Sequence, residues 1–331
     1  MTKVILPLSE PVPIHPEYLE DFWRFVCERQ SIYHRRLVEG ASPPWTTDGI
    51  LREYFFTNVY RELDKGTKFW TEEIVPYCDS YRDLVWNLIV YRYFNAIPTY
   101  RALVDDYYNG DESKVLRHAN KWDHKEVARF LTRRDLAGKQ VFTSAFTVTG
   151  VRFGGYPDKI RNVCFLMEKL QQQVPRVVGS LARASNLSNV FSIFHGLDGM
   201  GPFLAYELAI DINYPQTLVA FSEDDFVNPG PGCMAGLKYI FGHRTKMGYY
   251  ELIHFFRWRQ ERFFRMYGLW DTWRSVYPGY DLSLRSIEHS LCEFSKYART
   301  KYQITANGTP SRNATRRYRP PVHQDQMRLA I

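Results

Sequence analysis

The chain has 331 residues, enough for one large domain or two that bury a full core. Hydrophobic residues make up 45% of it and aromatic residues 16%, which excludes a largely disordered chain. The formal net charge of +7 favours an anionic partner such as nucleic acid, although many basic proteins bind none.

The N-terminal segment contains one short apolar run that prolines interrupt, and no later segment stays apolar for the ~18 residues of a membrane span. We therefore expect an intracellular, soluble protein without a membrane partner. Pro16 opens a helix that closes at Gly40, with proline in its first turn and glycine past its last. We assign residues 1–45 to an N-terminal helical extension.

Amphipathic helical patterns recur from there to the C-terminal region. Asp79 or Ser80 caps one helix, Pro98 opens the next, and Asp123 caps another. Helical pattern resumes over residues 157–213, 233–266 and 282–300. Between them, the β-branched and aromatic residues of 139–155 predict a small β-hairpin or an extended loop. The fold class is predicted to be all-α.

The helices are assigned to one domain over residues 46–304, with Gly-rich hairpins at 196–202 and 228–233. The last segment, residues 305–331, carries five arginines against the single acid Asp325. This composition predicts a disordered basic tail that either lies on phosphates or is simply a solvated terminus. The five cysteines are scattered without a CxxC pair, so we expect reduced thiols and no zinc or iron–sulfur site.

The segment "HGLDGMGPFLAYELAIDI" places a Gly-Met-Gly-Pro turn between two apolar helices. Such a turn lets the backbone approach a surface and directs the N–H groups of the second helix toward a phosphate oxygen. A tight helix–helix turn, in which glycine only permits close packing, explains it equally well. The pattern resembles the helix-hairpin-helix element of base-excision DNA glycosylases, in which the hairpin grips a DNA phosphate; its residues here are Leu197, Gly199, Met200, Gly201 and Ala205.

The glycosylase resemblance implies a catalytic Asp about twenty residues past the hairpin and, in lyase-type members, a Lys two residues after its second Gly. Phe203 stands at the lysine position, so lysine chemistry is not expected there. Asp224 and Asp225 are the plausible counterparts of the aspartate, 23 and 24 residues past Gly201. A second turn, "NPGPG", follows them and leads into another helix.

Three further segments place polar side chains among apolar and aromatic residues, where charge is costly unless it is paired or used. They are "FFTNVYRELDKGTKFW", "YRYFN" and "SIEHSLCEFSKYART". In the last one, Glu288, Cys292 and Lys296 share a helix face, with His289 and Glu293 on the adjacent line. A structural salt-bridge cluster explains each segment when it is taken alone.

Together with the two Gly-rich turns, these segments give the chain a resemblance to the α-glutamyl/putrescinyl-thymine pyrophosphorylase family, over roughly residues 50 to 300. This helical family is linked to phage 5-hydroxymethyluracil DNA kinases and includes amino acid:DNA transferases. The resemblance implies that a kinase activates 5-hydroxymethyluracil in DNA, and that an amine then displaces pyrophosphate or phosphate at the 5-methylene. It also implies a distant relation to helix-hairpin-helix glycosylases.

The resemblance implies roles for particular side chains. Candidate catalytic residues, for leaving-group contact and for removal of the amine proton, are Arg61, Asp64, Glu207 and Asp225. Candidate substrate-binding residues are Asn58, Lys65, Arg92, Asn95, Glu288 and Lys296. Candidate DNA-phosphate contacts are Gly199, Gly201, Gly230, Gly232 and Lys238. Tyr206 and Phe203 could stack on an extruded base or simply belong to the core.

The expected partners are double-stranded DNA that contains modified thymine, a free amino acid or polyamine, and a 5-hydroxymethyluracil DNA kinase in the infected host cell. No cofactor is expected to be required, although Mg²⁺ could bridge pyrophosphate to Asp224 and Asp225. Two alternatives stay open: a glycosylase that removes the modified base with the help of Asp225, and a non-catalytic DNA-binding module.

Overall fold

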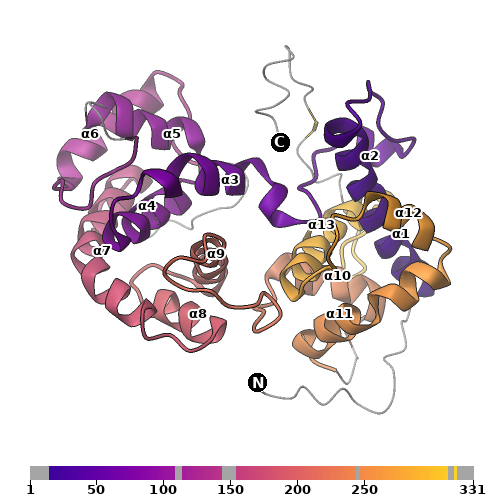
Figure 1. The fold of residues 1–331 in the computed structure, drawn as a ribbon. Coiled ribbons are helices and arrows are strands. Elements are labelled where there is room, and N and C mark those ends of the chain that lie inside the picture. Colours follow the sequence, from indigo (N-terminus) through magenta and orange to yellow (C-terminus); the bar gives the residue numbers. More distant parts are fainter. Residues whose placement is uncertain (1–14, 109–113, 144–153, 244–246, 312–316, 319–331) are drawn as a thin grey trace. The chain divides into compact units, whose positions relative to one another are not determined.

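The computed structural model describes residues 15–108, 114–143, 154–243, 247–311 and 317–318, most of which form helices (Figure 1). These residues contain no strand, and their β-type pairing is limited to two isolated bridges. The prediction of an all-α fold is confirmed. Most of the β-hairpin expected at 139–155 lies outside the described residues, because these do not include 144–153. Most of the expected basic tail, residues 305–331, lies outside them as well.

The α-helices are, in chain order, α1 Pro16–Tyr33, α2 Gly49–Glu53, α3 Lys65–Lys68, α4 Tyr81–Phe94, α5 Ile97–Ala102, α6 His124–Leu136, α7 Lys159–Leu181, α8 Leu187–His195, α9 Pro202–Asn213, α10 Pro231–Phe241, α11 Tyr249–Met266, α12 Trp270–Val276 and α13 Leu284–Tyr302. Short π-helical turns occur at His34–Val38, Phe69–Ile74 and Leu103–Tyr107, and 3₁₀ turns at Arg61–Leu63 and Val75–Tyr77. The expected starts at Pro16 and Asp123 are present, and Ser80 rather than Asp79 caps α4.

The chain divides into two compact units. Unit 1 combines residues 1–64 with 226–331, and unit 2 is the continuous segment 65–225. This division differs from the expected domain of residues 46–304, because the chain leaves unit 1 after Asp64 and returns to it at Phe226. The expected N-terminal extension is also part of a core, since α1 packs against α10, α12 and α13 within unit 1.

Aromatic rings form much of the core of unit 1. Trp23 of α1 stacks on Phe263 of α11 at 5.2 Å between ring centroids, and Phe264 stacks on Trp273 of α12 at 4.3 Å. Phe22 lies 5.4 Å from Phe256 in the same manner. Helices from both ends of the sequence are therefore joined by one set of large apolar side chains.

Two glycines allow α10 to lie directly against α13 (Figure 1). A Cβ atom on Gly236 would fall 2.3 Å from the carbonyl oxygen of Leu291, and one on Gly232 would fall 2.3 Å from the sulfur of Cys292. Their spacing of four residues places both on one face of α10. Close helix packing therefore explains why these two positions hold glycine.

Unit 2 is built around α4, in which every residue from Asp83 to Phe94 is buried. The helix packs against α5, α7 and α9, which together surround it. Asn95 ends α4 in the left-handed conformation, with φ of 46°, which asparagine tolerates well. The packing of unit 2 therefore buries even the polar positions of this helix.

Candidate functional site

Unit 1 contains a cluster of charged and polar side chains on its buried helix α13, the loop before Asp64, and α1. Its members, called the Asp64 cluster below, are Arg29, Asn58, Arg61, Asp64, His289, Glu293 and Lys296. The α13 members lie at spacings of four and three residues, which places them along one side of the helix. Of the sequence-predicted site residues, this cluster brings together Asn58, Arg61, Asp64 and Lys296.

Asn58 organises the loop that carries Asp64. Its backbone N–H donates to Asp64 Oδ1 at 2.8 Å, and its side-chain amide donates to the carbonyl of Leu63 at 2.9 Å. Arg29 of α1 donates from Nη2 to the Asn58 side-chain oxygen at 2.6 Å. The loop is therefore closed on itself and held to α1 through one asparagine that is only 4% exposed.

His289 of α13 faces Asp64 across this loop. Its Nε2 atom lies 3.5 Å from Asp64 Oδ2 and 2.8 Å from the hydroxyl oxygen of Thr57. The backbone N–H of Thr57 also donates to Glu293 Oε2 at 3.3 Å, which ties the same loop to the next turn of α13. A carboxylate, an imidazole and a hydroxyl therefore meet at one place.

The surroundings keep Asp64 ionised. Burial by itself would raise the pKa of Asp64, but the hydrogen bond and charge of His289, the N–H of Asn58 and the charge of Arg61 together hold that pKa below its usual range. Burial lowers the pKa of Arg29 to about 10, and the carboxylates of Asp64 and Glu293 partly offset this effect. The guanidinium still carries its charge at neutral pH.

Glu293 and Lys296 form the second ion pair of the cluster, with 2.5 Å between Oε1 and Nζ. Burial opposes the charge of Lys296, but Glu293 outweighs it, so the pKa of this lysine is raised. The lysine is therefore a cation in the cluster rather than a neutral nucleophile. Arg29, Arg61 and Lys296 place three cations beside the carboxylates of Asp64 and Glu293.

Glu288 serves a different set of contacts from Lys296. It accepts from the backbone N–H of Gly230 at 3.1 Å and from Arg285 Nη1 at 2.7 Å, and it is 5% exposed. The N–H of Gly230, expected to bind a phosphate, is therefore occupied inside unit 1, and Gly232 packs against Cys292 instead of facing a ligand. Lys238 lies in the last turn of α10, where the helix dipole favours a cation.

In unit 2, Arg92 and Asp211 form a buried ion pair between α4 and α9. The guanidinium grips both carboxylate oxygens, with 2.9 Å between Nη2 and Oδ1, and its Nη1 donates to Asn95 at 3.0 Å. Burial opposes the charge of Arg92, but Asp211, Tyr91 and Glu207 hold its pKa above the ordinary value. The expected substrate contacts Arg92 and Asn95 thus have internal partners that hold α4 to α9.

The other predicted site residues of unit 2, Glu207, Asp225 and Lys65, each have a different local environment. Glu207 is buried on α9, one turn before Asp211. Asp225 accepts from the backbone N–H of Leu187 at 2.8 Å and so caps the start of α8. Lys65 is the first residue of α3, and burial followed by the charge of Arg101 lowers its pKa.

The first Gly-rich turn joins α8 to α9, as the sequence predicts. Gly199 has φ of +74°, which favours glycine, whereas a Cβ on Gly201 would meet nothing within 4 Å. Phe203 is 38% exposed beside the turn, and Tyr206 is buried in the core. The space beside Gly201 is therefore not filled by neighbouring atoms.

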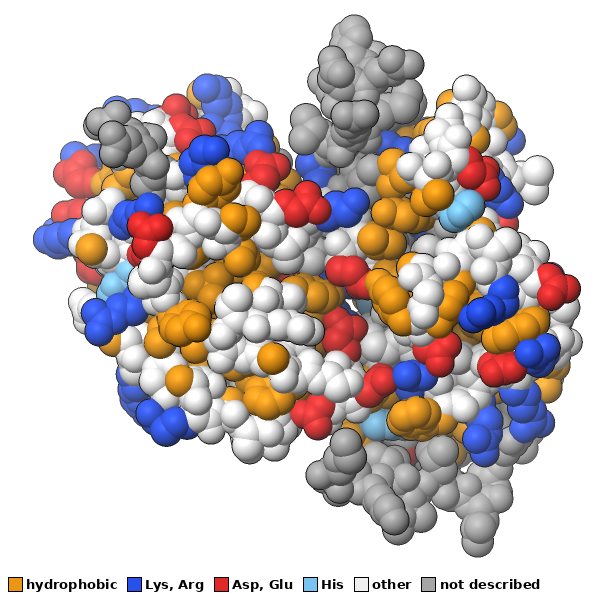
Figure 2. Space-filling model, viewed as in Figure 1, with side chains coloured by type: hydrophobic (Ala, Val, Ile, Leu, Met, Phe, Trp, Pro, Cys, Tyr) orange, Lys and Arg blue, Asp and Glu red, His pale blue; other side chains and the backbone are white. Residues whose placement is uncertain are grey.

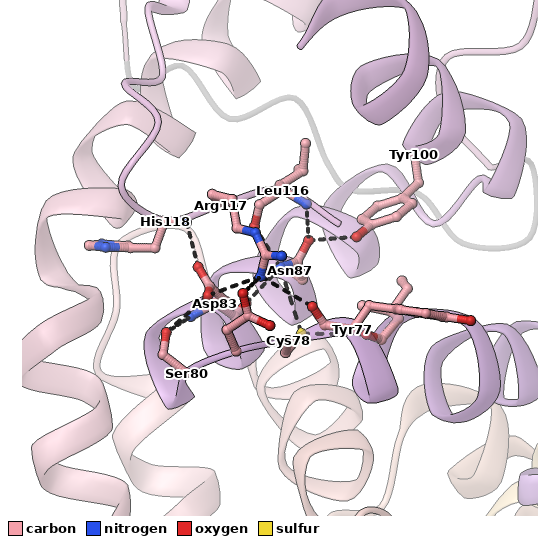
Figure 3. Close-up of polar contacts among 11 residues, drawn as sticks. Tyr77, Cys78, Ser80, Asp83, Asn87, Tyr100, Leu116, Arg117 and His118 are labelled. Atoms are coloured by element: carbon pink, nitrogen blue, oxygen red, sulfur yellow. Dashed lines mark hydrogen bonds and ion pairs between the residues drawn. The ribbon is translucent and has the colours of Figure 1, made fainter. Parts of the chain in front are cut away.

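A cavity of about 640 Å³ lies near the start of α4 and is lined in part by Asp83, Arg117 and His118. Figure 3 shows polar contacts at and beside this cavity: Asp83 accepts from the backbone N–H of His118 at 2.7 Å, and Asn87, which does not line the cavity, accepts from Tyr100 at 2.5 Å. None of the sequence-predicted site residues lines this cavity. Asp83 and Asn87 of α4 hold the segment around Leu116 to this helix.

Within the described ranges, no group of three or more His, Cys, Asp or Glu side chains is placed to hold a metal ion.

Burial raises the pKa of Cys292 to about 12, with further contribution from Glu293, so its thiol stays protonated. Among the same described residues, no helix has the length and apolar character needed to span a membrane.

Four contributors to the site region were not predicted as site residues: Arg29, Thr57, His289 and Glu293. The spacing of His289 and Glu293 along α13 was a usable signal, because four residues bring two side chains onto one face. Arg29 had no such signal. It lies in the segment expected to be an extension, and its contact with Asn58 spans 29 residues.

The family model described as "5-hmdU DNA kinase, helical domain" matches residues 16–306. The chain is also 28% identical, over 313 residues, to a 5-hmdU DNA kinase of Bacillus phage SP10. That match covers 88% of this chain but 47% of the phage protein, so the chain spans about half the length of this relative. No solved structure shows significant similarity.

The family match begins at the first residue of α1, so the segment that was expected to lie outside the resemblance is part of the family's domain. This agrees with the packing of α1 against α13 in unit 1. The chain belongs to the family of 5-hmdU DNA kinase helical domains.

Proposed function

We propose that this chain modifies 5-hydroxymethyluracil in DNA by transferring an amine onto the 5-methylene of the activated base. The amine would come from an amino acid or a polyamine, as in the transferase members of the pyrophosphorylase family that the sequence resembles. The observation that carries the proposal is the contact of His289 with Asp64 beside the cations of the Asp64 cluster. The family match supplies the link to 5-hydroxymethyluracil.

The proposed reaction needs a base, because an amine arrives protonated at neutral pH. In our proposal His289 accepts one proton from the ammonium group, and the ionised carboxylate of Asp64 stabilises the imidazolium that results. The nitrogen lone pair then forms the C–N bond at the 5-methylene carbon. The C–O bond to the leaving group breaks, and its electron pair departs with the pyrophosphate.

The cations of the Asp64 cluster suit the other charged groups of this reaction. Arg61 is 8% exposed, and Arg29 presents a planar guanidinium beside Asn58. Guanidinium groups bind phosphate or carboxylate oxygens through two parallel hydrogen bonds. Arg29 and Arg61 would hold the leaving pyrophosphate or the carboxylate of an amino acid, and Asn58 would keep Arg29 in place.

The test is to incubate the purified chain with duplex DNA containing 5-pyrophosphoryloxymethyluracil and a mixture of amino acids and polyamines. The DNA is then digested to nucleosides, which are measured by mass spectrometry. We expect a nucleoside that has gained one amine. We expect His289→Gln to slow product formation by about 10²- to 10⁴-fold, the usual range for loss of a general base. A parallel reaction with EDTA tests the expectation that no metal is required.

His124→Gln is the matched control, because His124 also pairs with a carboxylate, Glu168, at 2.9 Å, and lies on α6 in unit 2. It should retain wild-type product formation. Equal loss in both variants, or an unchanged rate in His289→Gln, would contradict the role of His289. Release of a free base would instead favour a glycosylase.

A second function is favoured by the name of the phage relative, a 5-hmdU DNA kinase. In that case the chain takes part in phosphorylation of the hydroxymethyl group. Incubation with γ-labelled ATP and DNA that contains 5-hydroxymethyluracil distinguishes the two: label on the DNA supports the kinase, and amine addition to the activated base without label supports the transferase.

A further inference from the structure

Helix α11 turns one side to the core of unit 1 and the other to solvent. The rings of Phe256, Phe263 and Phe264 are buried, and they stack on or edge against Trp23 and Trp273. These contacts fix the rotation of α11 about its axis. Side chains on the opposite side of the helix therefore point away from the core.

The outward side of α11 combines arginines with large apolar side chains. Trp258 is 53% exposed and Met266 is 54% exposed, which is unusual for side chains of this size. Arg262 and Arg265 lie between them at helical spacings of four and three residues. Trp258, Arg262, Arg265 and Met266 therefore form one exposed stripe.

Helix α12 continues this stripe through Trp270. The guanidinium of Arg265 lies 4.2 Å from the centre of the Trp270 ring, and that of Arg274 lies 5.6 Å from the same ring. Arg274 also lies 4.7 Å from the ring of Tyr277. Cation–π contacts of this kind hold the guanidinium groups of Arg265 and Arg274 in defined positions.

The surface carries an excess of positive charge. Between residues 257 and 281 the sequence has five arginines and three acidic residues. One of the acids, Glu261, pairs with Arg265 at 2.8 Å, and Asp281 lies 3.6 Å from Arg257. Figure 2 shows Lys and Arg side chains interspersed with Asp and Glu side chains at the lower right of the view.

We propose that this surface, formed by Arg257, Trp258, Arg262, Arg265, Trp270 and Arg274, binds the phosphate backbone of duplex DNA. The choice of DNA as the partner rests on the proposed function. Arginines held against rings suit phosphates, because a fixed guanidinium can offer two parallel N–H donors to the oxygens of one phosphate. A bilayer would require a continuous apolar face, whereas arginines separate Trp258 from Met266 here.

The surface lies on α11 and α12, and the Asp64 cluster uses neither helix. A contact that grips only phosphates positions the DNA without reading its sequence. The α11–α12 surface would thus hold any duplex, and recognition of the modified base would come from elsewhere in the protein.

The experiment measures binding of a fluorescent duplex of about 24 base pairs, containing 5-hydroxymethyluracil, to the full chain at a series of salt concentrations. Arg265→Gln/Arg274→Gln removes the two charges that flank Trp270. Each phosphate contact adds about 0.9 to the slope of log affinity against log salt, so this variant should lose about 2 from that slope. It should also bind roughly tenfold or more weakly at low salt.

Arg129→Gln/Arg133→Gln on α6 is the matched control. Both of its arginines are exposed and four residues apart, and Arg129 pairs with Glu126 as Arg265 pairs with Glu261. The control should bind like the wild type. Circular dichroism of each variant shows that its helices are intact.

The outcomes separate this proposal from the proposed function. Equal binding by the wild type and Arg265→Gln/Arg274→Gln would overturn the surface and leave the transferase proposal standing. Equal weakening in the α6 control would overturn it as well, since net charge alone would then explain the loss. Failure of the wild type to bind duplex DNA at low salt would overturn both. Binding to phosphatidylserine vesicles is measured for the same proteins. If Arg265→Gln/Arg274→Gln lost vesicle binding but kept wild-type DNA binding, the surface would bind a membrane and the proposal would be overturned.

Discussion

Asp64 owes its charge to neighbours from distant parts of the sequence. The N–H of Asn58 comes from its own loop, whereas His289 comes from α13, more than two hundred residues away. Such contacts make an ionised carboxylate part of the folded state, because they bind the charged form more strongly than the protonated form. The stability of unit 1 should therefore depend on pH through this residue.

The pKa of Asp64 is lower in the folded state than in the unfolded chain, where a value near 3.9 is ordinary. Its contribution to the free energy of unfolding is thus fully present above about pH 4 and is lost as the pH falls through the lower folded-state value. We expect Asp64→Asn to destabilise the protein by about 1–3 kcal/mol at pH 7, as for loss of a charged hydrogen bond. The difference from the wild type should shrink at acidic pH.

Urea unfolding of Asp64→Asn and the wild type, from about pH 7 to about pH 3, measures this difference. Asp271→Asn is the control, because Asp271 is exposed on α12 and its loss should cost less than about 0.5 kcal/mol. A destabilisation by Asp64→Asn that stays constant over the whole pH range would mean that lost packing, rather than lost charge, causes it.

Arg92, unlike Asp64, is a predicted site residue whose contacts in the structure point to a structural role. Its sequence context, an arginine at the end of a buried helix, fits either a ligand contact or an internal ion pair. The structure supplies a carboxylate partner that is itself 0% exposed, Asp211 of α9. An arginine whose charge is already matched in the core has little to offer a substrate.

At the scale of helices, the approach of α10 to α13 places Gly230 within reach of Glu288 and orders the start of α10. Gly236→Ala should break this arrangement, since its Cβ would lie 2.3 Å from the carbonyl oxygen of Leu291, and a backbone atom cannot move aside cheaply. We expect a loss of about 1–3 kcal/mol in the free energy of unfolding. Helix propensity alone would give a gain of up to about 1 kcal/mol.

Gly49→Ala provides the comparison, because a Cβ on Gly49 in α2 meets nothing within 4 Å. Its effect on the free energy of unfolding, measured by urea unfolding, should stay within about 1 kcal/mol. A Gly236→Ala protein as stable as the wild type would show that α10 and α13 can separate without cost. The contact of these helices would then not explain the two glycines.

The two Gly-rich turns show that a local sequence pattern does not decide whether the N–H groups of a turn are available to a ligand. Two short helices joined at a Gly-rich turn are predicted by the sequence and present in the structure. The second Gly-rich turn has the same local pattern, yet its amide at Gly230 is bound to Glu288. Similar turns therefore differ in whether their N–H groups are available, because that depends on which helix packs beside them.

At the scale of the whole molecule, unit 2 is one continuous segment whereas unit 1 is assembled from two. The central helix of unit 2, α4, is covered by α5, α7 and α9, all within residues 65–225. A segment with its own core should fold by itself. Residues 65–225 produced alone should show a helical circular dichroism spectrum and a cooperative urea transition.

Residues 1–64 produced alone are the comparison, and they should remain unfolded. The partners of Phe22 and Trp23 lie on α11 and α13, which this segment lacks. A gradual, non-cooperative transition of residues 65–225 would mean that unit 2 needs contacts from outside its own segment.

Local features of the fold were decided by the sequence. Pro16 starts α1, Asp123 caps α6, and the spacing of apolar residues predicts helices throughout, because capping and helical periodicity depend on residues at most four positions apart. Asn58, Arg61 and Asp64 lie at successive intervals of three residues along one segment, so the sequence was enough to group them as site candidates. The family was also indicated by short segments and their order, and the family match bears this out at the level of the helical domain.

Tertiary structure decided which of these polar segments meet. The hydroxyl of Thr57 and the imidazole of His289 are 232 residues apart in sequence and 2.8 Å apart in space. Arg29 reaches Asn58 because α1 packs into unit 1, and Arg92 is matched by Asp211 because α4 packs on α9. No periodic pattern contains this information, since the contact of two distant side chains depends on how whole helices pack.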